Sequence, residues 1–123
     1  MQAIRTDLAP RAIGPYSQAV LKNGTLFVSG QLGIDPATGL LERTLEVQTR
    51  QVFANIAAIL AAAGMTMADV VKATVFLQDL DSFALFNEIY AQQFRAPYPA
   101  RETVQVARLP KDALIEVSVV AVK

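Results

Sequence analysis

The sequence predicts an α+β domain, with two helices covering one face of a mixed sheet of about six strands. Three observations lead to this prediction. The order of the segments along the chain is β-β-β-α-β-α-β-β. Two of these segments carry apolar residues at helical spacing. The closing segment alternates between a uniformly apolar face and a mixed face, as expected for a strand with helices on one side only. The 123 residues fit a single domain spanning 1–123.

The first third of the chain contains strand and turn signals. Residues 2–6 suit a short strand, and 17–31 suit a hairpin whose Asn23-Gly24 pair fits a type I′ turn. The prolines and glycine of 8–17 predict a loop, and the composition of 35–39 predicts a second turn.

Two helices are predicted, over residues 45–64 and 82–94. Gly64 is a suitable stop for the first helix and Asp81 a suitable N-cap for the second, which Pro97 ends. Each predicted helix has one apolar face, formed by Val52, Phe53, Ile56, Ile59, Leu60 and Ala63 in the first and by Phe83, Phe86, Tyr90 and Phe94 in the second.

The remaining strands are predicted over 69–80, 102–107 and 114–122. In the last strand Glu116 alternates with apolar residues, so it is expected to point away from the helices. By the same alternation Arg101, at the start of the preceding strand, is expected to point away from them too. Alternation alone favours a salt bridge over a catalytic pair, and it leaves open whether the two residues meet within one chain or across chains.

Composition indicates an oligomer. Apolar residues make up 53% of the chain and the mean hydropathy is +0.34, which is high for a small domain. A second subunit would cover the sheet face that the two helices leave open.

Charge and residue usage exclude several functions. Eleven basic residues balance eleven acidic ones, which argues against nucleic-acid and membrane-surface binding. No signal peptide or membrane span is evident, so a cytoplasmic location is expected. The chain has no Cys and no His, which excludes thiolate and imidazole catalysis and makes a metal site unexpected.

Several segments together resemble one protein family over essentially the whole chain, in order and with matching spacing. They are "IGPYSQAV", "FVSGQLGIDPATG", "VVKATVFLQDLDSFALFNEIYAQQF", "PAR" and "VARLPKDALIEVSVVAV". These segments resemble the Rid family, also called YjgF, and within it the archetypal imine-deaminase branch. The resemblance implies a chorismate-mutase-like fold and a homotrimer whose sheets form a central barrel, with sites in the clefts between subunits. It also implies hydrolysis of 2-imino acids, such as 2-iminopropanoate formed from 2-aminoacrylate, to 2-oxo acids and ammonia without metal or cofactor.

The same resemblance implies roles for named residues. Arg101 of "PAR" would bind the substrate carboxylate, for which a guanidinium fork is well suited. Glu116 of "IEV" would hold or activate the attacking water. Tyr16, Ser29 and Asn87 would line the ligand pocket, although without the resemblance each would be expected to have a structural role.

The chain departs from the family pattern beside the arginine. Many relatives carry a cysteine where this chain has Thr103, so an essential thiol is excluded here, while the threonine backbone and hydroxyl remain able to contact a ligand. Glu102 replaces a small residue, and strand alternation turns it away from Arg101.

Two other classes of function compete with the imine hydrolase. The first is a non-catalytic small-molecule binder or a holdase that uses exposed apolar surface. The second is a ribonuclease, against which the absent histidines and the zero net charge argue. Retention of both Arg101 and Glu116 favours the enzyme, because a carboxylate works against simple anion binding.

Overall fold

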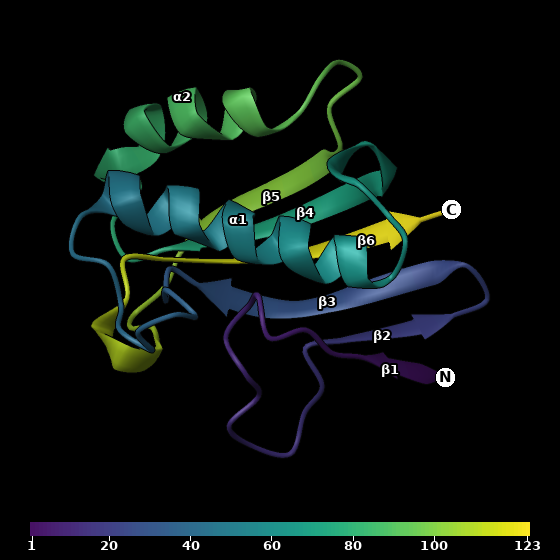
Figure 1. Cartoon of the computed structure of the whole chain (residues 1–123). Coiled ribbons are helices and arrows are strands. Elements are labelled where there is room, and N and C mark those ends of the chain that lie inside the picture. The colour runs from purple at the N-terminus through teal and green to yellow at the C-terminus, as the bar shows by residue number, and fades with distance from the viewer.

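The computed structural model describes residues 1–123, and Figure 1 shows the arrangement of its elements. The two α-helices are α1 (Leu45–Ala62) and α2 (Phe83–Gln93). The strands are β1 (Gln2–Ile4), β2 (Ala19–Lys22), β3 (Thr25–Leu32), β4 (Val70–Leu77), β5 (Ala100–Gln105) and β6 (Ile115–Val122). Short 3₁₀ turns occupy Met67–Asp69, Leu80–Ser82 and Pro110–Asp112.

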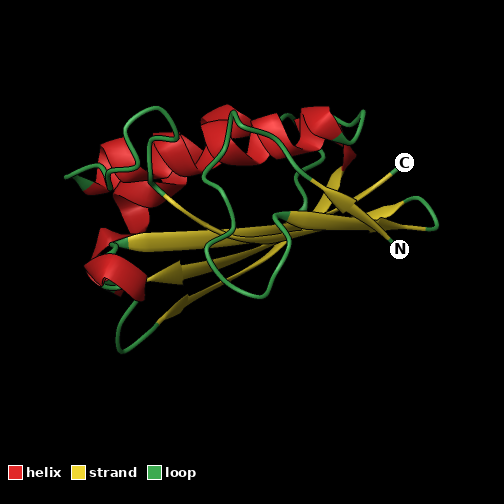
Figure 2. Cartoon of the chain, turned by 60° about the horizontal axis from the view of Figure 1, so that its bottom comes forward, coloured by secondary structure: helices red, strands yellow, loops and turns green.

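The six strands form one mixed sheet in the order β1-β2-β3-β6-β4-β5. Only the β4–β5 pair is parallel, and every other neighbouring pair is antiparallel. Figure 2 shows the two long helices as one layer over a single face of the sheet. The predicted α+β architecture, with two helices on one face of a mixed sheet, is confirmed.

The β2–β3 hairpin has the predicted tight turn. Asn23 and Gly24 have φ angles of 51° and 77°, the left-handed values that a type I′ turn requires at both central positions. A side chain on Gly24 would also approach the Lys123 carbonyl oxygen to 2.8 Å. The glycine is therefore required here by both the backbone conformation and the space.

Helix α1 matches its prediction closely. The Thr44 side chain caps its N-terminus by accepting a hydrogen bond from the Val47 amide, and Gly64, with a φ of 73°, follows its C-terminus. The apolar face is buried as predicted at Val52, Phe53, Ile56, Ile59 and Leu60. This face also carries three buried polar residues, which are Gln48, Thr49 and Asn55.

Helix α2 begins differently from the prediction. Asp81 is not an N-cap, because it lies inside the 3₁₀ turn Leu80–Ser82, which the Asp79 side chain caps by accepting from the Asp81 amide. The helix itself starts at Phe83 with no side-chain cap. Asp79, two residues upstream of the predicted cap, therefore caps the 3₁₀ turn that precedes α2.

The last two strands of the chain, β5 and β6, are not neighbours in the sheet. Strand β6 lies between β3 and β4, whereas β5 is the edge strand and pairs only with β4. The structure also starts β5 at Ala100, two residues before the predicted start at 102. This order separates Arg101 from Glu116 by the full width of β4.

The two faces of the sheet differ in burial. Ile115, Val117, Val119 and Ala121 of β6 are almost completely buried under the helices, as predicted. The opposite face leaves apolar side chains in solvent, with Phe27 50% exposed and Val104 45% exposed. No helix of the protein combines the length and apolar character needed to cross a bilayer.

Candidate functional site

Arg101 points toward the helices, and the expectation that it points away from them is wrong. In the parallel β4–β5 ladder Arg101 lies beside Ala73, whose side chain is completely buried in the helix-covered core. Paired residues present their side chains to the same face of a sheet. Because β5 is an edge strand, the long Arg101 side chain lies against the first two turns of α2 and still contacts solvent.

Helix α2 supplies a rigid setting for the Arg101 guanidinium. Its Nη1 atom donates a 2.8 Å hydrogen bond to Oδ1 of Asn87. The guanidinium carbon lies 4.6 Å from the ring centre of Tyr90, 5.4 Å from that of Phe86 and 5.5 Å from that of Phe83. Three aromatic faces at these distances attract and orient a cation. These rings and Asn87 hold the guanidinium in place while most of its five N–H donors stay free.

No acidic side chain neutralises Arg101, and the four salt bridges of the chain involve other residues. Glu102 turns to the opposite face, as predicted, and its carboxylate lies 2.7 Å from Nζ of Lys72. A half-buried guanidinium without an acidic partner is suited to binding an anionic ligand.

Two hydroxyl groups near Arg101 are also unpaired. Oγ1 of Thr103, on the same face of β5, and the phenol oxygen of Tyr90 are buried without any hydrogen-bond partner. Burial raises the pKa of Tyr90, and the positive charge of Arg101 opposes this only in part. Native structures rarely leave buried hydroxyls unsatisfied, so these atoms are available to a ligand or to another polar group.

Glu116 lies on the open face of the sheet, as predicted from the alternation of β6. Its neighbours in the sheet are Leu32 of β3 and Phe76 of β4. The register of β3 shifts by one residue between Val28 and Gln31, which forms a bulge opposite this part of β6. Bulges occur often beside functional sites, where they redirect side chains.

Gly30 in this bulge makes room for the Glu116 carboxyl group. A Cβ atom at Gly30 would lie 2.8 Å from Cδ and 3.1 Å from Oε1 of Glu116. Real Cβ atoms do not approach so closely, so only glycine fits at this position without moving the carboxyl group.

The environment of Glu116 favours its protonated form. Burial raises the pKa of the Glu116 carboxyl above its ordinary value, and no cation forms a salt bridge with it. A carboxylate with a raised pKa is a better proton acceptor near neutral pH than an exposed one.

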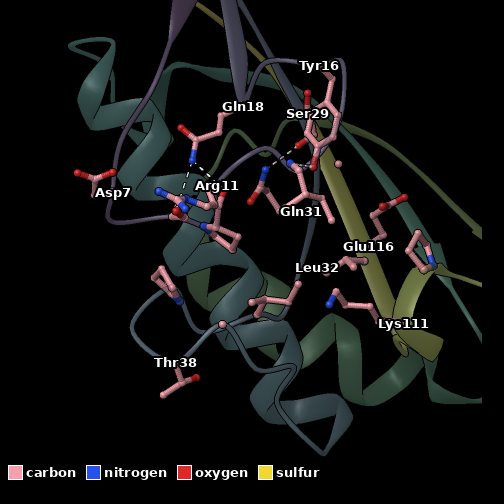
Figure 3. Close-up of a pocket in the computed structure, with 18 of the residues that line it drawn as sticks. Asp7, Arg11, Tyr16, Gln18, Ser29, Gln31, Leu32, Thr38, Lys111 and Glu116 are labelled. Atoms are coloured by element: carbon pink, nitrogen blue, oxygen red, sulfur yellow. Dashed lines mark hydrogen bonds between the residues drawn. The ribbon is translucent and has the colours of Figure 1, made fainter.

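Glu116 lines a pocket of about 870 Å³, shown in Figure 3. Its walls come from the loop that follows β1, from the β3 bulge, from the loop after β3 and from the turn before β6. Tyr16 and Ser29 line the same pocket, together with Gln31, Arg11 and Lys111. Tyr16 is 52% exposed and Ser29 is half-buried.

Ser29 and Tyr16 also have structural contacts. The Ser29 hydroxyl donates a 2.6 Å hydrogen bond to the Ser17 carbonyl oxygen, and the Tyr16 phenol oxygen accepts a long 3.5 Å bond from the Ile13 amide. Both side chains therefore shape the loop, and both keep hydrogen-bonding capacity toward the pocket.

The six predicted site residues fall into two groups. Arg101 and Thr103, on the helix-covered side of β5, and Asn87 of α2 are here called the arginine group. Glu116, Tyr16 and Ser29, here called the glutamate group, line the pocket beside the β3 bulge. On the open face, Glu116 lies in one row with Phe76 and Val104. Arg101 is three residues along β5 from that row and on the other face, so one chain does not bring the two groups together.

The sequence did not predict a role in the site for several residues. The helical spacing of Phe83, Phe86 and Tyr90 predicts only an apolar helix face and does not reveal the cation beside them. Gly30 had the signal of an isolated glycine within a strand, which often marks a bulge or a close approach. The left-handed backbone conformation of Lys111, with a φ of 58°, is not predicted by the sequence either. No cluster of three or more His, Cys, Asp or Glu side chains suited to a metal ion is present.

Comparison with known proteins places these features in a family. A family model described as Endoribonuclease L-PSP matches residues 6–123. A RutC family protein of Sulfurisphaera tokodaii is 50% identical over 124 residues, covering 100% of this chain and 99% of its own. A 2-iminobutanoate/2-iminopropanoate deaminase of Bos taurus is 48% identical over 121 residues, covering 98% of this chain and 88% of its own.

The fold comparison agrees. The crystal structure of RidA from an Antarctic Psychrobacter species superimposes with a TM-score of 0.98 at 48% identity, and the match covers 100% of both chains. This similarity confirms the fold that the resemblance to the Rid family implied.

Proposed function

Because this chain belongs to the Endoribonuclease L-PSP family, also called the Rid or YjgF family, we propose that it hydrolyses reactive 2-imino acids to 2-oxo acids and ammonia. Its substrates would be small imino acids such as 2-iminopropanoate and 2-iminobutanoate, together with their enamine forms. The name of the bovine relative supports this substrate class at 48% identity.

One observation carries the proposal: the chain presents an unpaired guanidinium and an unpaired carboxyl group, both half-buried. A 2-imino acid offers a carboxylate for the first and an electrophilic carbon for a water held by the second. Arg101 would bind the substrate carboxylate with two parallel hydrogen bonds, oriented by Asn87 and the rings of α2.

Glu116 would act as the general base. It takes one proton from water as the oxygen attacks the carbon of the protonated imine, which forms a carbinolamine. The same carboxyl group returns that proton to the nitrogen, the C–N bond breaks, and ammonia leaves. The Glu116 carboxylate then takes the hydroxyl proton, which yields the 2-oxo acid, and passes that proton to solvent. The raised pKa of Glu116 suits the first transfer, because burial makes its carboxylate a stronger proton acceptor, and the carboxyl group so formed can give the proton back.

We further propose that each site forms between two subunits. Arg101 and Glu116 lie on opposite faces of the sheet in one chain, so a substrate that contacts both requires Arg101 of one subunit and Glu116 of its neighbour. A homotrimer closed around the open sheet faces has three equivalent interfaces of this kind. It would also cover the exposed apolar side chains of that face, including Phe27 and Val104.

A coupled assay tests the activity. A serine or threonine dehydratase generates 2-aminoacrylate or its homologue in the presence and absence of this protein, and release of ammonia and 2-oxo acid is followed. Faster release with the protein is expected, and it should persist after treatment with EDTA. An unchanged rate would contradict the proposal.

The competing functions give different results in the same experiments. A non-catalytic binder would bind 2-oxo acids without accelerating ammonia release, and it would tolerate Glu116→Gln. A ribonuclease would cleave RNA in a manner independent of Arg101 and Glu116.

A further inference from the structure

Buried amide side chains hold the walls of the Glu116 pocket. Gln18 binds the loop that follows β1, through the backbone of Thr6 and the carbonyl oxygens of Ala9 and Pro10. Asn55 of α1 donates to the carbonyl oxygens of Leu32 and Ile34. A third amide, Gln48, differs from these because it contacts two separate walls.

Gln48 joins segments that are far apart in the sequence. Its Nε2 donates a 2.8 Å hydrogen bond to the Glu42 carbonyl oxygen, and its Oε1 accepts a 2.8 Å hydrogen bond from the Leu114 amide. The side chain is only 2% exposed, so water does not compete for either bond. Each bond satisfies a backbone group that lies outside the sheet ladders.

The loop between β3 and α1 is held tightly against Gln48. A Cβ atom at Gly33 would lie 2.5 Å from the Gln48 Cα, so the loop backbone touches the helix directly at that point. The Glu42 amide in turn donates to the Gly33 carbonyl oxygen, which closes the loop at its base. The residues between these two points include Ile34 and Pro36, which line the pocket.

The second wall is the turn before β6. Lys111 and Asp112 both adopt left-handed backbone conformations there, with φ angles of 58° and 55°. Such conformations are costly for residues other than glycine, and they persist only where the surroundings fix them. The bond from Leu114 to Gln48 fixes this turn to α1 two residues before Glu116.

From these contacts we infer that Gln48 is a positioning residue, whose single carboxamide sets the separation of the two pocket walls and the placement of the Glu116 carboxyl group. Neither hydrogen bond involves Glu116 itself, so Gln48 acts through the backbone of the turn and of β6. The effect on catalysis rests on the proposed function, but the effect on placement does not.

Three variants on α1 test this role. Gln48→Met keeps the size of the side chain and removes both bonds. Gln48→Glu keeps the acceptor for the Leu114 amide, and in its protonated form, which burial favours, it can also donate to the Glu42 carbonyl oxygen. Thr49→Val is the matched control, because it removes a buried hydrogen bond one residue away, from the Thr49 hydroxyl to the Leu45 carbonyl oxygen, without touching either wall.

We expect kcat of Gln48→Met for 2-iminobutanoate to fall by about tenfold to a hundredfold, with KM changed much less, as for a misplaced catalytic group. Hydrogen exchange at the Leu114 amide should accelerate in the same variant. Gln48→Glu should keep Leu114 protected and retain most of kcat. Thr49→Val should lower the melting temperature while leaving kcat and Leu114 exchange as in the wild type.

The inference is overturned if Gln48→Met keeps its kcat, or if Thr49→Val loses as much activity as Gln48→Met. If the wild-type protein does not hydrolyse imines, the proposed function fails. The positioning role of Gln48 is then tested by the NMR chemical shift of the Glu116 carboxyl ¹³C signal. A shift of that signal in Gln48→Met but not in Thr49→Val supports the positioning role, and an unmoved signal contradicts it.

Discussion

The arginine group and the glutamate group are built on different physical principles. Side chains hold Arg101, since Asn87 binds its guanidinium and the rings of α2 surround it. Backbone geometry places Glu116 instead, through the β3 bulge and the missing side chain of Gly30. Arg101 is thus oriented by direct contacts, whereas no hydrogen bond to another side chain orients the Glu116 carboxyl group.

This difference indicates how the two groups would share the work. An oriented cation is suited to binding, because little conformational freedom remains to be lost when an anion arrives. An unpaired carboxyl group in a partly dry setting is suited to proton transfer, because its pKa is raised. Changes in the arginine group should therefore affect substrate binding and turnover together, and changes around Glu116 should affect mainly turnover.

The largest effect is expected for Arg101→Ala. Loss of a two-point contact with a carboxylate should lower kcat/KM by about a thousandfold, in keeping with several kcal/mol for such a contact. The fold should survive, because Arg101 lies on an edge strand and is not part of the apolar core. Steady-state kinetics and circular dichroism measure the two outcomes.

Arg95→Ala is the matched control, because Arg95 is exposed and forms no salt bridge. Near-normal rates in Arg101→Ala would show that the residue is structural.

Glu116→Gln should lower turnover by about a hundredfold, as for removal of a general base. The amide keeps the size of the side chain, so binding of 2-oxobutyrate should persist or become tighter once the negative charge is gone. Calorimetry and single-turnover kinetics separate these effects. Turnover equal to that of the wild type would remove Glu116 from the mechanism.

Gly30→Ala should have an intermediate effect. The new methyl group would lie 2.8 Å from Cδ of Glu116, closer than real contacts allow, so the carboxyl group must move. We expect kcat to fall by about tenfold, with little change in KM. Gly14→Ala is a suitable control, since its nearest contact would be an ordinary 3.6 Å from the Tyr16 ring. Equal activity of the two variants would contradict the spatial role of Gly30.

The smallest expected effect is on stability. Burial raises the pKa of Glu116 in the fold above its value in the unfolded chain. Such an acid stabilises the fold fully below its unfolded pKa, and this contribution is lost as the pH rises through the folded pKa. Glu116→Gln should therefore melt at the same temperature as the wild type at low pH and a few degrees higher at neutral pH, on the order expected for small changes in stability. If the melting temperatures of Glu116→Gln and the wild type differ by the same amount at every pH, the carboxyl group is not desolvated in the fold.

The sequence predicted these two groups unequally well. The orientation of Glu116 followed from alternation, because β6 is a central strand whose inward residues must all be apolar. The orientation of Arg101 did not, because an edge strand tolerates a long charged side chain on either face. The parallel pairing of β5 with β4, which sets the orientation of Arg101, joins distant segments and is not predicted by any turn residue in the sequence.

Other features of the two groups also depend on contacts between distant segments, which sequence patterns do not predict. The aromatic rings around Arg101 have the spacing of an ordinary core face, and their second role depends on the edge strand beneath them. The bulge at Gly30 is defined by pairing with β6, nearly ninety residues away in the chain. The Asp81 cap was mispredicted because Asp79 begins a 3₁₀ turn just before α2.

The central claim is that Arg101 of one subunit and Glu116 of another complete each site, and mixing two inactive variants tests it directly. Arg101→Ala and Glu116→Gln are unfolded together, refolded as mixed oligomers and assayed for imine hydrolysis. An interface between an intact Arg101 and an intact Glu116 then arises in about a quarter of cases in a random mixture. The account predicts recovery of about a quarter of wild-type activity, whereas a mixture as inactive as its components would contradict it.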